Sequence, residues 1–170
     1  MTKRTIQENQ AVKRINSNTQ SSQKEIYLVL DNIRSMHNIG AIFRTADAAG
    51  VKKIFLCGIT ATPPRPQIAK TALNTIDHVQ WKYYKSSLKA VQNLIHNNIQ
   101  IVCLEQTDDS IDYRNFSYHK PLAIIVGNEI EGIRDEIISL SDIRIEIPMH
   151  GIANSLNVAT ATGIALFNII

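Results

Sequence analysis

Short apolar runs alternate with segments of helical periodicity along most of this chain. Except for the aromatic and basic run at residues 78–85, these runs are rich in Ile, Val and Leu, which is typical of strands in a buried sheet. They occupy residues 25–30, 53–57, 78–85, 99–104, 122–126 and 143–147. Helical spacing appears at residues 39–46, 86–97 and 134–140, and again after residue 157. Strands that alternate with helices predict an α/β domain whose mostly parallel sheet is flanked by helices. The run LAIIV at 122–126 is expected at the centre of that sheet.

Size and composition narrow the class of protein. A chain of 170 residues suits one compact domain with a core that needs no disulfides. No apolar run approaches the roughly 20 residues of a membrane-spanning helix, and the polar N-terminus lacks a signal-peptide pattern, so a cytoplasmic location is expected. Cys57 and Cys103 lie in separate apolar runs and are expected to be buried, reduced thiols. The net charge of +3 permits a polyanionic partner but does not require one.

Residues 1–24 differ in composition from the rest of the chain. They are rich in Asn, Gln, Ser and Thr and include two Lys-Arg pairs. Such a segment buries little apolar surface and is predicted to form a mobile basic arm, which leaves residues 25–170 as the folded domain. The arm either touches phosphate groups or is a solvated tail without a role.

Polar clusters follow three of the predicted strands. They are Asn38 with Arg44, Asn128 with Glu129, and Asn154 with Ser155 and Asn157. The carboxyl ends of parallel strands meet at one edge of a sheet, where open α/β folds bind their ligands. The third cluster also opens a helix, whose N-terminus favours an anionic or carbonyl-bearing ligand. The sequence therefore predicts a binding site at this edge.

Each cluster also has a purely structural interpretation. Arg44 alone reads as a solvated residue on a helix face, and Asn38 lies where its amide can either cap the helix or point at a ligand. Glu129 can be no more than a helix-start residue. Asn154 or Ser155 can be a simple N-cap of the last helix.

Two further segments carry basic residues. The predicted loop at 62–70 is stiffened by three prolines and contains Arg65 and Lys70, so it either faces a substrate or only connects its neighbours. In the strand at 78–85, aromatic residues are interleaved with lysines. Such a strand can stack nucleic-acid bases, although aromatics that pack on the sheet are the commoner arrangement.

Several catalytic signatures are absent from the sequence. There is no GxxxxGK[ST] segment, no GxGxxG after the first strand, no GxSxG and no HExxH. These absences argue against a P-loop enzyme, an ordinary Rossmann dehydrogenase, an α/β-hydrolase and a zinc protease. No metal site is expected, since neither cysteine has a histidine at metal-ligand spacing.

Three segments resemble, in order, the three motifs of the SpoU branch of the SPOUT RNA methyltransferases. They are residues 32–50, 125–133 and 147–163. The resemblance extends from Ile26 to Ile170 and implies an α/β fold with a C-terminal deep trefoil knot. The alternation of elements alone predicts an open, flavodoxin-like sheet, because knots are very rare among folds.

The resemblance also implies a cofactor and an assembly. S-adenosylmethionine would bind in the knot through backbone groups at positions that match Leu104, Gly127, Ile147 and Leu156. Members of the family are homodimers whose interface includes the knot and lies beside the active site. Apolar residues of the last helix are candidates for that interface or for the core: Ile164, Leu166, Phe167, Ile169 and Ile170.

The implied reaction is methylation of a ribose 2′-hydroxyl in transfer RNA or ribosomal RNA. The positions that match the catalytic residues of the family are Asn38, Arg44, Glu129, Ser155 and Asn157. Arg34, Arg65 and Lys70 are the candidates for contacts with RNA. Arg44 is not expected to be a simple base, because a guanidinium holds its proton far above neutral pH and neutralising it at pH 7 costs roughly 7 to 9 kcal/mol from free-residue values. Stabilising the developing alkoxide, or a neighbouring phosphate that takes its proton, demands less of the guanidinium.

Substrate choice is less constrained than the reaction. Transfer RNA is slightly favoured, because the sequence is little more than the catalytic domain of this family. The alternative is a catalytically inactive, knotted factor that binds RNA or assists ribosome assembly. The presence of all five matched catalytic positions argues against that alternative, since a binding module has no need of them together.

Overall fold

The structure is a computed structural model that describes residues 5, 25–119 and 121–170. The predicted basic arm therefore lies, apart from residue 5, outside the described residues. The strands are β1 (Ile26–Asp31), β2 (Lys53–Cys57), β3 (Gln80–Tyr84), β4 (Gln100–Leu104), β5 (Ile111–Asp112), β6 (Leu122–Val126) and β7 (Ile143–Glu146). The helices are α2 (Met36–Ala49), α3 (Pro66–Ala72), α4 (Ser87–His96), α5 (Asp135–Ile138) and α6 (Val158–Ile169). Two short 3₁₀ helices are η1 (Thr75–Asp77) and η2 (Tyr113–Asn115).

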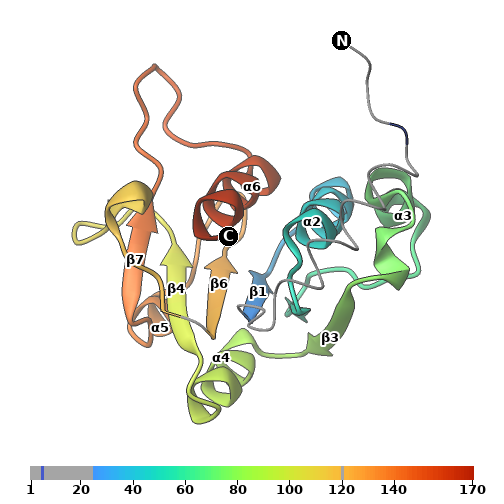
Figure 1. Cartoon of the computed structure of the whole chain (residues 1–170), viewed down its shortest axis with the longest axis horizontal. Coiled ribbons are helices and arrows are strands. Elements are labelled where there is room, and N and C mark those ends of the chain that lie inside the picture. Colours follow the sequence, from blue (N-terminus) through green and yellow to red (C-terminus); the bar gives the residue numbers. More distant parts are fainter. Residues whose placement is uncertain (1–4, 6–24, 120) are drawn as a thin grey trace.

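The strands form one seven-stranded sheet in the order β3-β2-β1-β6-β4-β7-β5, and all pairs between them are parallel (Figure 1). This confirms the prediction of a mostly parallel α/β sheet. Strand β6 lies between β1 and β4, and all five of its residues are buried. The central place predicted for LAIIV is thus confirmed.

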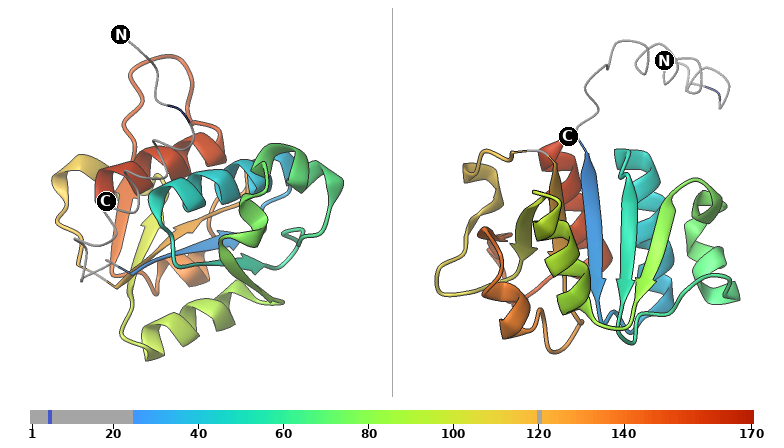
Figure 2. Two further views of the ribbon diagram at one scale, coloured as in Figure 1. Left: turned by 45° about the vertical axis from the view of Figure 1, so that its right-hand side comes forward. Right: turned by 90° about the horizontal axis from the view of Figure 1, so that it is seen from below.

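Helices cover both faces of the sheet (Figure 2). On one face α2 lies against both α3 and α6, and on the other face lie α4 and α5. Successive residues of β1 point to opposite faces, so that Leu28 belongs to the core under α2 and Val29 to the core under α4. Burial on both faces explains why β1 reads as a continuous apolar run rather than an alternating one.

Helix α2 follows the prediction closely. Its expected apolar stripe is fully buried: Ile39, Ile42, Phe43 and Ala46. The helix begins after Ser35, whose side chain accepts a hydrogen bond from the backbone N–H of Asn38. It ends at Gly50, which has φ +71°, a left-handed conformation that glycine adopts without strain.

The loop predicted at residues 62–70 is wrong in its second half, because α3 begins at Pro66. Proline fits the first turn of a helix, where no partner for its missing N–H is needed. Helix α3 lies directly on α2, since a Cβ at Gly40 would be 2.1 Å from Thr71 Oγ1 and 2.3 Å from the carbonyl oxygen of Ile68. The two-residue strand β5 was also not predicted, because it is too short to show a period of two.

Two more sequence-based expectations can be examined in the described residues. Cys57 and Cys103 are buried and unpaired, as predicted. Burial raises the pKa of each thiol to about 12, so both remain protonated at neutral pH. None of the helices in this part of the chain is long and apolar enough to cross a membrane.

Candidate functional site

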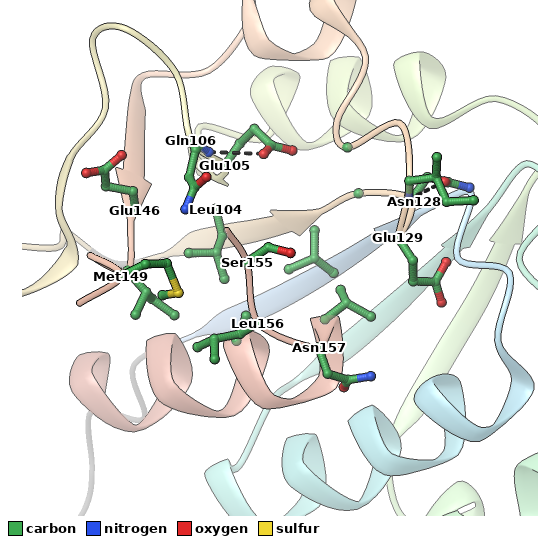
Figure 3. Close-up of a pocket in the computed structure, with 17 residues that line it drawn as sticks. Leu104, Glu105, Gln106, Asn128, Glu129, Glu146, Met149, Ser155, Leu156 and Asn157 are labelled. Atoms are coloured by element: carbon green, nitrogen blue, oxygen red, sulfur yellow. Dashed lines mark hydrogen bonds between the residues drawn. The ribbon is translucent and has the colours of Figure 1, made fainter. Parts of the chain in front are cut away.

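A cavity of about 430 Å³ opens where β4, β6 and β7 end and α6 begins (Figure 3). Its walls come from residues within 104–106, 126–132 and 146–158, with Ala161. The four positions predicted to hold the cofactor all line it: Leu104, Gly127, Ile147 and Leu156. Three predicted catalytic residues line it as well: Glu129, Ser155 and Asn157. The parallel sheet therefore brings these segments together, as the strand-end argument expects, while the roles of the residues stay predictions.

Gly127 allows the chain to fold back on itself immediately after β6. A Cβ at this position would be 2.2 Å from the backbone of Gly132, which real structures do not tolerate. Two backbone hydrogen bonds, 3.1 and 2.9 Å long, join Asn128 and Gly132 across the resulting turn. Any larger residue at Gly127 would force this wall of the cavity apart.

The turn at residues 127–133 is also held by hydrogen bonds to residues outside it. The side-chain oxygen of Asn128 accepts from the backbone N–H groups of Ile130 and Glu131, and its amide nitrogen donates to the carbonyl of Asn32 at 2.9 Å. At the far end Glu105 Oε2 accepts from the N–H of Ile133 at 2.9 Å. Contacts to the loops after β1 and β4 therefore set the position of this turn.

Glu129 extends from this turn to the start of α2. Its carboxylate accepts hydrogen bonds from the backbone N–H of Arg34 at 3.0 Å, the N–H of Ser35 at 3.1 Å and the side-chain amide of Asn38 at 2.9 Å. Partial desolvation alone would raise the pKa of Glu129, but these hydrogen bonds favour the ionised form and hold the pKa below its usual range. The carboxylate is therefore charged at neutral pH.

Asn157 connects the same group to α6. Its side-chain oxygen accepts from the backbone N–H of Ala159 at 3.0 Å and of Thr160 at 3.4 Å, which makes it the N-cap of the helix. Its amide nitrogen donates to Asn38 Oδ1 at 3.0 Å. We call the hydrogen-bonded chain of Glu129, Asn38 and Asn157 the amide relay, because the amide of Asn38 joins the other two side chains.

The relay changes two of the structural interpretations drawn from the sequence. The N-cap of α6 is Asn157, so the assignment of that role to Asn154 or Ser155 is wrong. The N-cap of α2 is Ser35, which leaves the amide of Asn38 to bind Glu129 and Asn157. Sequence spacing could not decide these points, because Ser, Asp and Asn all suit an N-cap.

Ser155 lines the cavity near Leu104 and Leu156 (Figure 3). It is exposed, and its hydroxyl makes no hydrogen bond to any other residue in the described part of the chain. The residue before Ser155 is held by Gln106, whose amide nitrogen donates to the carbonyl of Asn154 at 3.0 Å. The position of Ser155 is thus held through its backbone while its hydroxyl stays open to a ligand.

Arg44 does not line the cavity of its own chain. It lies on α2 six residues after Asn38, which corresponds to about 9 Å along the helix and to a different face. Its side chain is exposed and has no ion pair or hydrogen bond among residues 25–119 and 121–170. Asp47 lies three residues further along α2 and could have paired with Arg44. Its carboxylate lies 3.8 Å from the imidazole of His78.

The three residues predicted to bind RNA are all exposed. Arg34 is at the rim of the site, where its backbone N–H holds Glu129. Arg65 occupies the N-cap position of α3, and Lys70 lies within that helix rather than in a loop. Their contact with RNA remains a prediction.

Several lining residues were not singled out from the sequence. They are Glu105, Gln106, Glu146 and Met149. Glu105 and Gln106 follow directly after β4, so their place at a strand end was the available signal. Glu146 is held by the hydroxyl of Ser110, which donates to Glu146 Oε2 at 2.6 Å, a contact across 36 residues that local spacing cannot reveal.

Comparison with known proteins agrees with this geometry. The sequence profile of the SpoU rRNA methylase family matches residues 25–167. The chain belongs to the SpoU rRNA methylase family. The resemblance seen in the three motifs is thereby confirmed, and those motifs of this SpoU chain supply the turn at 127–133, the amide relay and the N-cap of α6.

Individual SpoU relatives show how far the similarity extends. The chain is 35% identical over 159 residues to the tRNA (guanosine(18)-2′-O)-methyltransferase of Aquifex aeolicus, covering 92% of this chain and 74% of that protein. It is 32% identical over 145 residues to the enzyme of the same name from Escherichia coli, covering 85% of this chain and 62% of that protein. The crystal structure of an AdoMet-bound rRNA methyltransferase from Sinorhizobium meliloti superposes with a TM-score of 0.77 at 33% identity, over 86% of this chain and 56% of that one.

The cavity suits the cofactor implied by the family. Its volume is in the range of small-molecule sites, and Leu104, Met149 and Leu156 offer apolar surface to a ring. The missing Cβ of Gly127 lets a ligand approach the backbone closely. Glu105 and Glu129 give this part of the molecule a negative charge that favours a cationic sulfur. No cluster of three or more metal-binding side chains occurs among the described residues.

Proposed function

We propose that this chain transfers the methyl group of S-adenosylmethionine to a ribose 2′-hydroxyl of transfer RNA or ribosomal RNA. The observation that carries the proposal is the amide relay, which fastens all three family motifs together at the mouth of one cavity. The names of the SpoU relatives support the same reaction and slightly favour transfer RNA. The chain covers 74% and 62% of the two named transfer RNA enzymes, so the choice of RNA is part of the proposal.

Glu129 positions the site rather than accepting the proton of the 2′-hydroxyl. Its oxygens already accept three N–H groups, and its pKa is lowered, so it is a weak base at neutral pH. The carboxylate instead holds the loop before α2 against the turn after β6. Asn38 and Asn157 act in the same way, because each amide is fixed by the other. The three residues of the amide relay thus form the frame of the site.

Two side chains without hydrogen-bond partners among the described residues, those of Ser155 and Arg44, meet the reacting ribose. We call these two residues the rim of the site. S-adenosylmethionine, when bound, supplies a methyl group on a positively charged sulfur. The hydroxyl of Ser155 has no partner among the described residues and can hydrogen-bond the ribose. The guanidinium of Arg44 stabilises the 2′-oxygen while a neighbouring phosphate of the RNA accepts the proton of the hydroxyl, which requires no deprotonated arginine.

This role for Arg44 requires a second subunit, because the residue is outside the cavity lining of its own chain. We therefore include a homodimer in the proposal, with Arg44 of one subunit completing the cavity of its partner. Phe167 on α6 and Ile170 at its C-cap are 55% and 51% exposed and suit such an interface. Leu166 and Ile169 from the same helix are buried in the core. The deep trefoil knot implied by the family completes the proposed fold.

A cytoplasmic location fits this activity. Two buried, unpaired cysteines are usual in a reducing compartment, and cellular RNA is the expected substrate.

Methyl transfer to RNA tests the proposal directly. The purified chain is incubated with total cellular RNA and S-adenosylmethionine carrying a labelled methyl group, and the RNA is digested to nucleosides. We expect label in 2′-O-methyl nucleosides and almost none with Arg44→Ala. Cofactor affinity measured by calorimetry should be nearly unchanged in that variant, since the positions proposed to hold the cofactor are Leu104, Gly127, Ile147 and Leu156.

The competing function predicts a different result. A catalytically inactive RNA-binding or assembly factor would bind RNA, with or without the cofactor, and transfer no label to any RNA. That outcome would replace the proposed reaction. Label in bases rather than in ribose would also overturn it.

A further inference from the structure

Charge is distributed unevenly along the chain and across the sheet. Residues 51–104 contain seven Lys and Arg but a single Asp, whereas residues 105–146 contain four Lys and Arg and ten Asp and Glu. The first segment forms β2, α3, β3, α4 and β4, and β3 is the outermost strand on that side. The second forms β5 and β7 at the opposite edge, together with the central β6. A polyanion is therefore attracted to the β3 side of the molecule.

Ion pairing strengthens this asymmetry. The arginines of the acidic segment are neutralised by carboxylates, with Arg114 bound to Asp112 and Arg144 to Asp109. Six cations of the basic segment have no carboxylate within 4.0 Å in the part of the chain that the structure describes: Lys53, Arg65, Lys70, Lys82, Lys85 and Lys89. Their charge remains available to a ligand.

Strand β3 combines this charge with exposed aromatic rings. Trp81 and Tyr83 are 36% and 45% exposed. They alternate along the strand and so share one face, with their rings roughly 7 Å apart. The hydroxyl of Tyr83 donates to the carbonyl of Gly58 at 3.0 Å, which fixes its ring. Tyr84, in contrast, packs on the sheet against Phe55 with centroids 5.7 Å apart. The packing expected for the aromatics of this strand thus holds for Tyr84 but not for the other two.

We propose that β3 is a contact surface for unpaired nucleotides of the substrate RNA, with Trp81 and Tyr83 stacking on bases and Lys85, directly after the strand, neutralising phosphates. Successive bases stack on such rings in many proteins that bind single strands. The inference rests on the proposed function, since it assumes an RNA substrate. Because all strands are parallel, the carboxyl end of β3 is at the same edge of the sheet as the cavity. Three strand spacings, about 14 Å, separate β3 from β6, so one RNA can reach both.

Neither protection of a sheet edge nor self-association accounts for β3 as fully. Lysines on an edge strand prevent sheet-to-sheet aggregation, but that role does not require an exposed tryptophan or a hydrogen-bonded tyrosine. Pairing of β3 with a second copy of the chain would bring Lys82 and Lys85 toward the same lysines of the partner. Repulsion between like charges opposes that arrangement, whereas RNA phosphates complement it.

The fluorescence of Trp81 tests the proposal without a label, because it is the single tryptophan of the chain. A twelve-residue oligouridylate should quench this emission in a saturable manner, and added salt should weaken the effect. Heparin, a polyanion without bases, should bind but quench far less. Equal quenching by heparin, no quenching by the oligonucleotide, or emission that changes with protein concentration alone would overturn the stacking role.

Substitutions test the surface in the reaction itself. Trp81→Leu combined with Tyr83→Leu should raise the KM for RNA about fivefold or more and leave kcat within about twofold. Trp81→Phe, which keeps a ring, should remain near the unsubstituted chain. Ile111→Ala is the matched control, because Ile111 is also 36% exposed but lies on the opposite edge strand, β5.

The outcomes separate this inference from the proposed function. If the unsubstituted chain methylates RNA and the double variant keeps its KM, the contact surface is wrong while the enzyme stands. If the unsubstituted chain methylates no RNA, the proposed function fails first. Should the double variant be unfolded by circular dichroism, Lys85→Ala replaces it, and an unchanged KM there would equally exclude the surface.

Discussion

The polar residues matched to the family motifs fall into two groups that differ in how they are bonded. In the amide relay, Glu129, Asn38 and Asn157 hold one another and the start of α6. The side chains of Arg44 and Ser155 have no hydrogen-bond partner in the described part of the chain. A group whose bonds are already made stabilises the shape of a site, whereas an unbonded group remains available to a substrate. The comparison therefore divides the residues matched to the motifs into a hydrogen-bonded frame, which is the amide relay, and an unbonded rim, which is Arg44 and Ser155.

The largest effect on activity is expected at the rim. Arg44→Lys keeps the positive charge but loses the planar, forked guanidinium, and should lose most of the activity, a decrease in kcat of about a hundredfold or more. Because Arg44 is exposed, the free energy of unfolding should change by less than about 0.5 kcal/mol. Methyl transfer and urea unfolding measure the two quantities. Near-normal turnover would show that charge alone is sufficient and would break the division between frame and rim.

The position of Arg44 gives the second prediction. Phe167→Glu places a charge on the exposed face of α6 and should convert a dimer to a monomer, measured by analytical ultracentrifugation. Activity should fall with the loss of the dimer, by about tenfold or more if the partner subunit supplies Arg44. Ile95→Glu, at a residue of α4 that is 41% exposed, is the control and should change neither property. A fully active monomer would place Arg44 in its own site.

Asn157 has two roles in the frame, because it caps α6 and also donates to Asn38. Substitutions at this position can separate the two roles. Asn157→Ala removes the N-cap of α6 and should lower the free energy of unfolding by about 1 kcal/mol. Asn157→Asp keeps an oxygen for the helix N-terminus but loses the amide hydrogen that Asn38 accepts, so its stability should stay closer to that of the unsubstituted chain. Both variants should lose activity, by about tenfold, because Asn38 keeps its hydrogen bond to Glu129 but loses the one to Asn157. Full activity in the Asp variant would remove Asn38 from the frame.

The division between frame and rim also explains what the sequence could predict. Apolar periodicity predicts β1, β6 and α2 well, because burial of those residues on one stripe or on both faces produces a local pattern. The convergence of Asn38, Glu129 and Asn157 follows from the parallel sheet. Their mutual hydrogen bonds do not, since Glu129 reaches Asn38 across 91 residues and Asn157 reaches it across 119.

Some features of the fold left no local signal in the sequence. Helix α3 has seven residues and begins in a segment with three prolines, which reads as a loop. The close approach of α3 to α2 depends on Gly40, and a single glycine inside a helical pattern does not indicate what packs against it. Arg44 does not line the cavity of its own chain, and the dimer that we propose to bring it to a partner's cavity is not described by any periodicity within one chain.

The smallest expected effect is the pH dependence of the frame. The pKa of Glu129 is lower in the folded chain than its unfolded value of about 4.3, so the unfolded state binds more protons in acid. Its stabilising contribution is therefore complete above that value and is lost as the pH falls through the folded pKa. Because the side chain is partly exposed, the contribution should be about 1 kcal/mol or less.

Glu129→Gln isolates this contribution from the remaining acidic groups. At pH 7 the substitution should lower the free energy of unfolding slightly, because an amide has one acceptor oxygen for the N–H groups of Arg34, Ser35 and Asn38. The difference from the unsubstituted chain should shrink as the pH falls below the unfolded pKa of Glu129, because the unfolded state then takes up a proton that the folded state does not yet bind. Glu131→Gln is the matched control, since the carboxylate of Glu131 has no partner among the described residues. A difference that persists unchanged in acid would mean that the shape of the side chain, rather than its charge, holds the loop before α2.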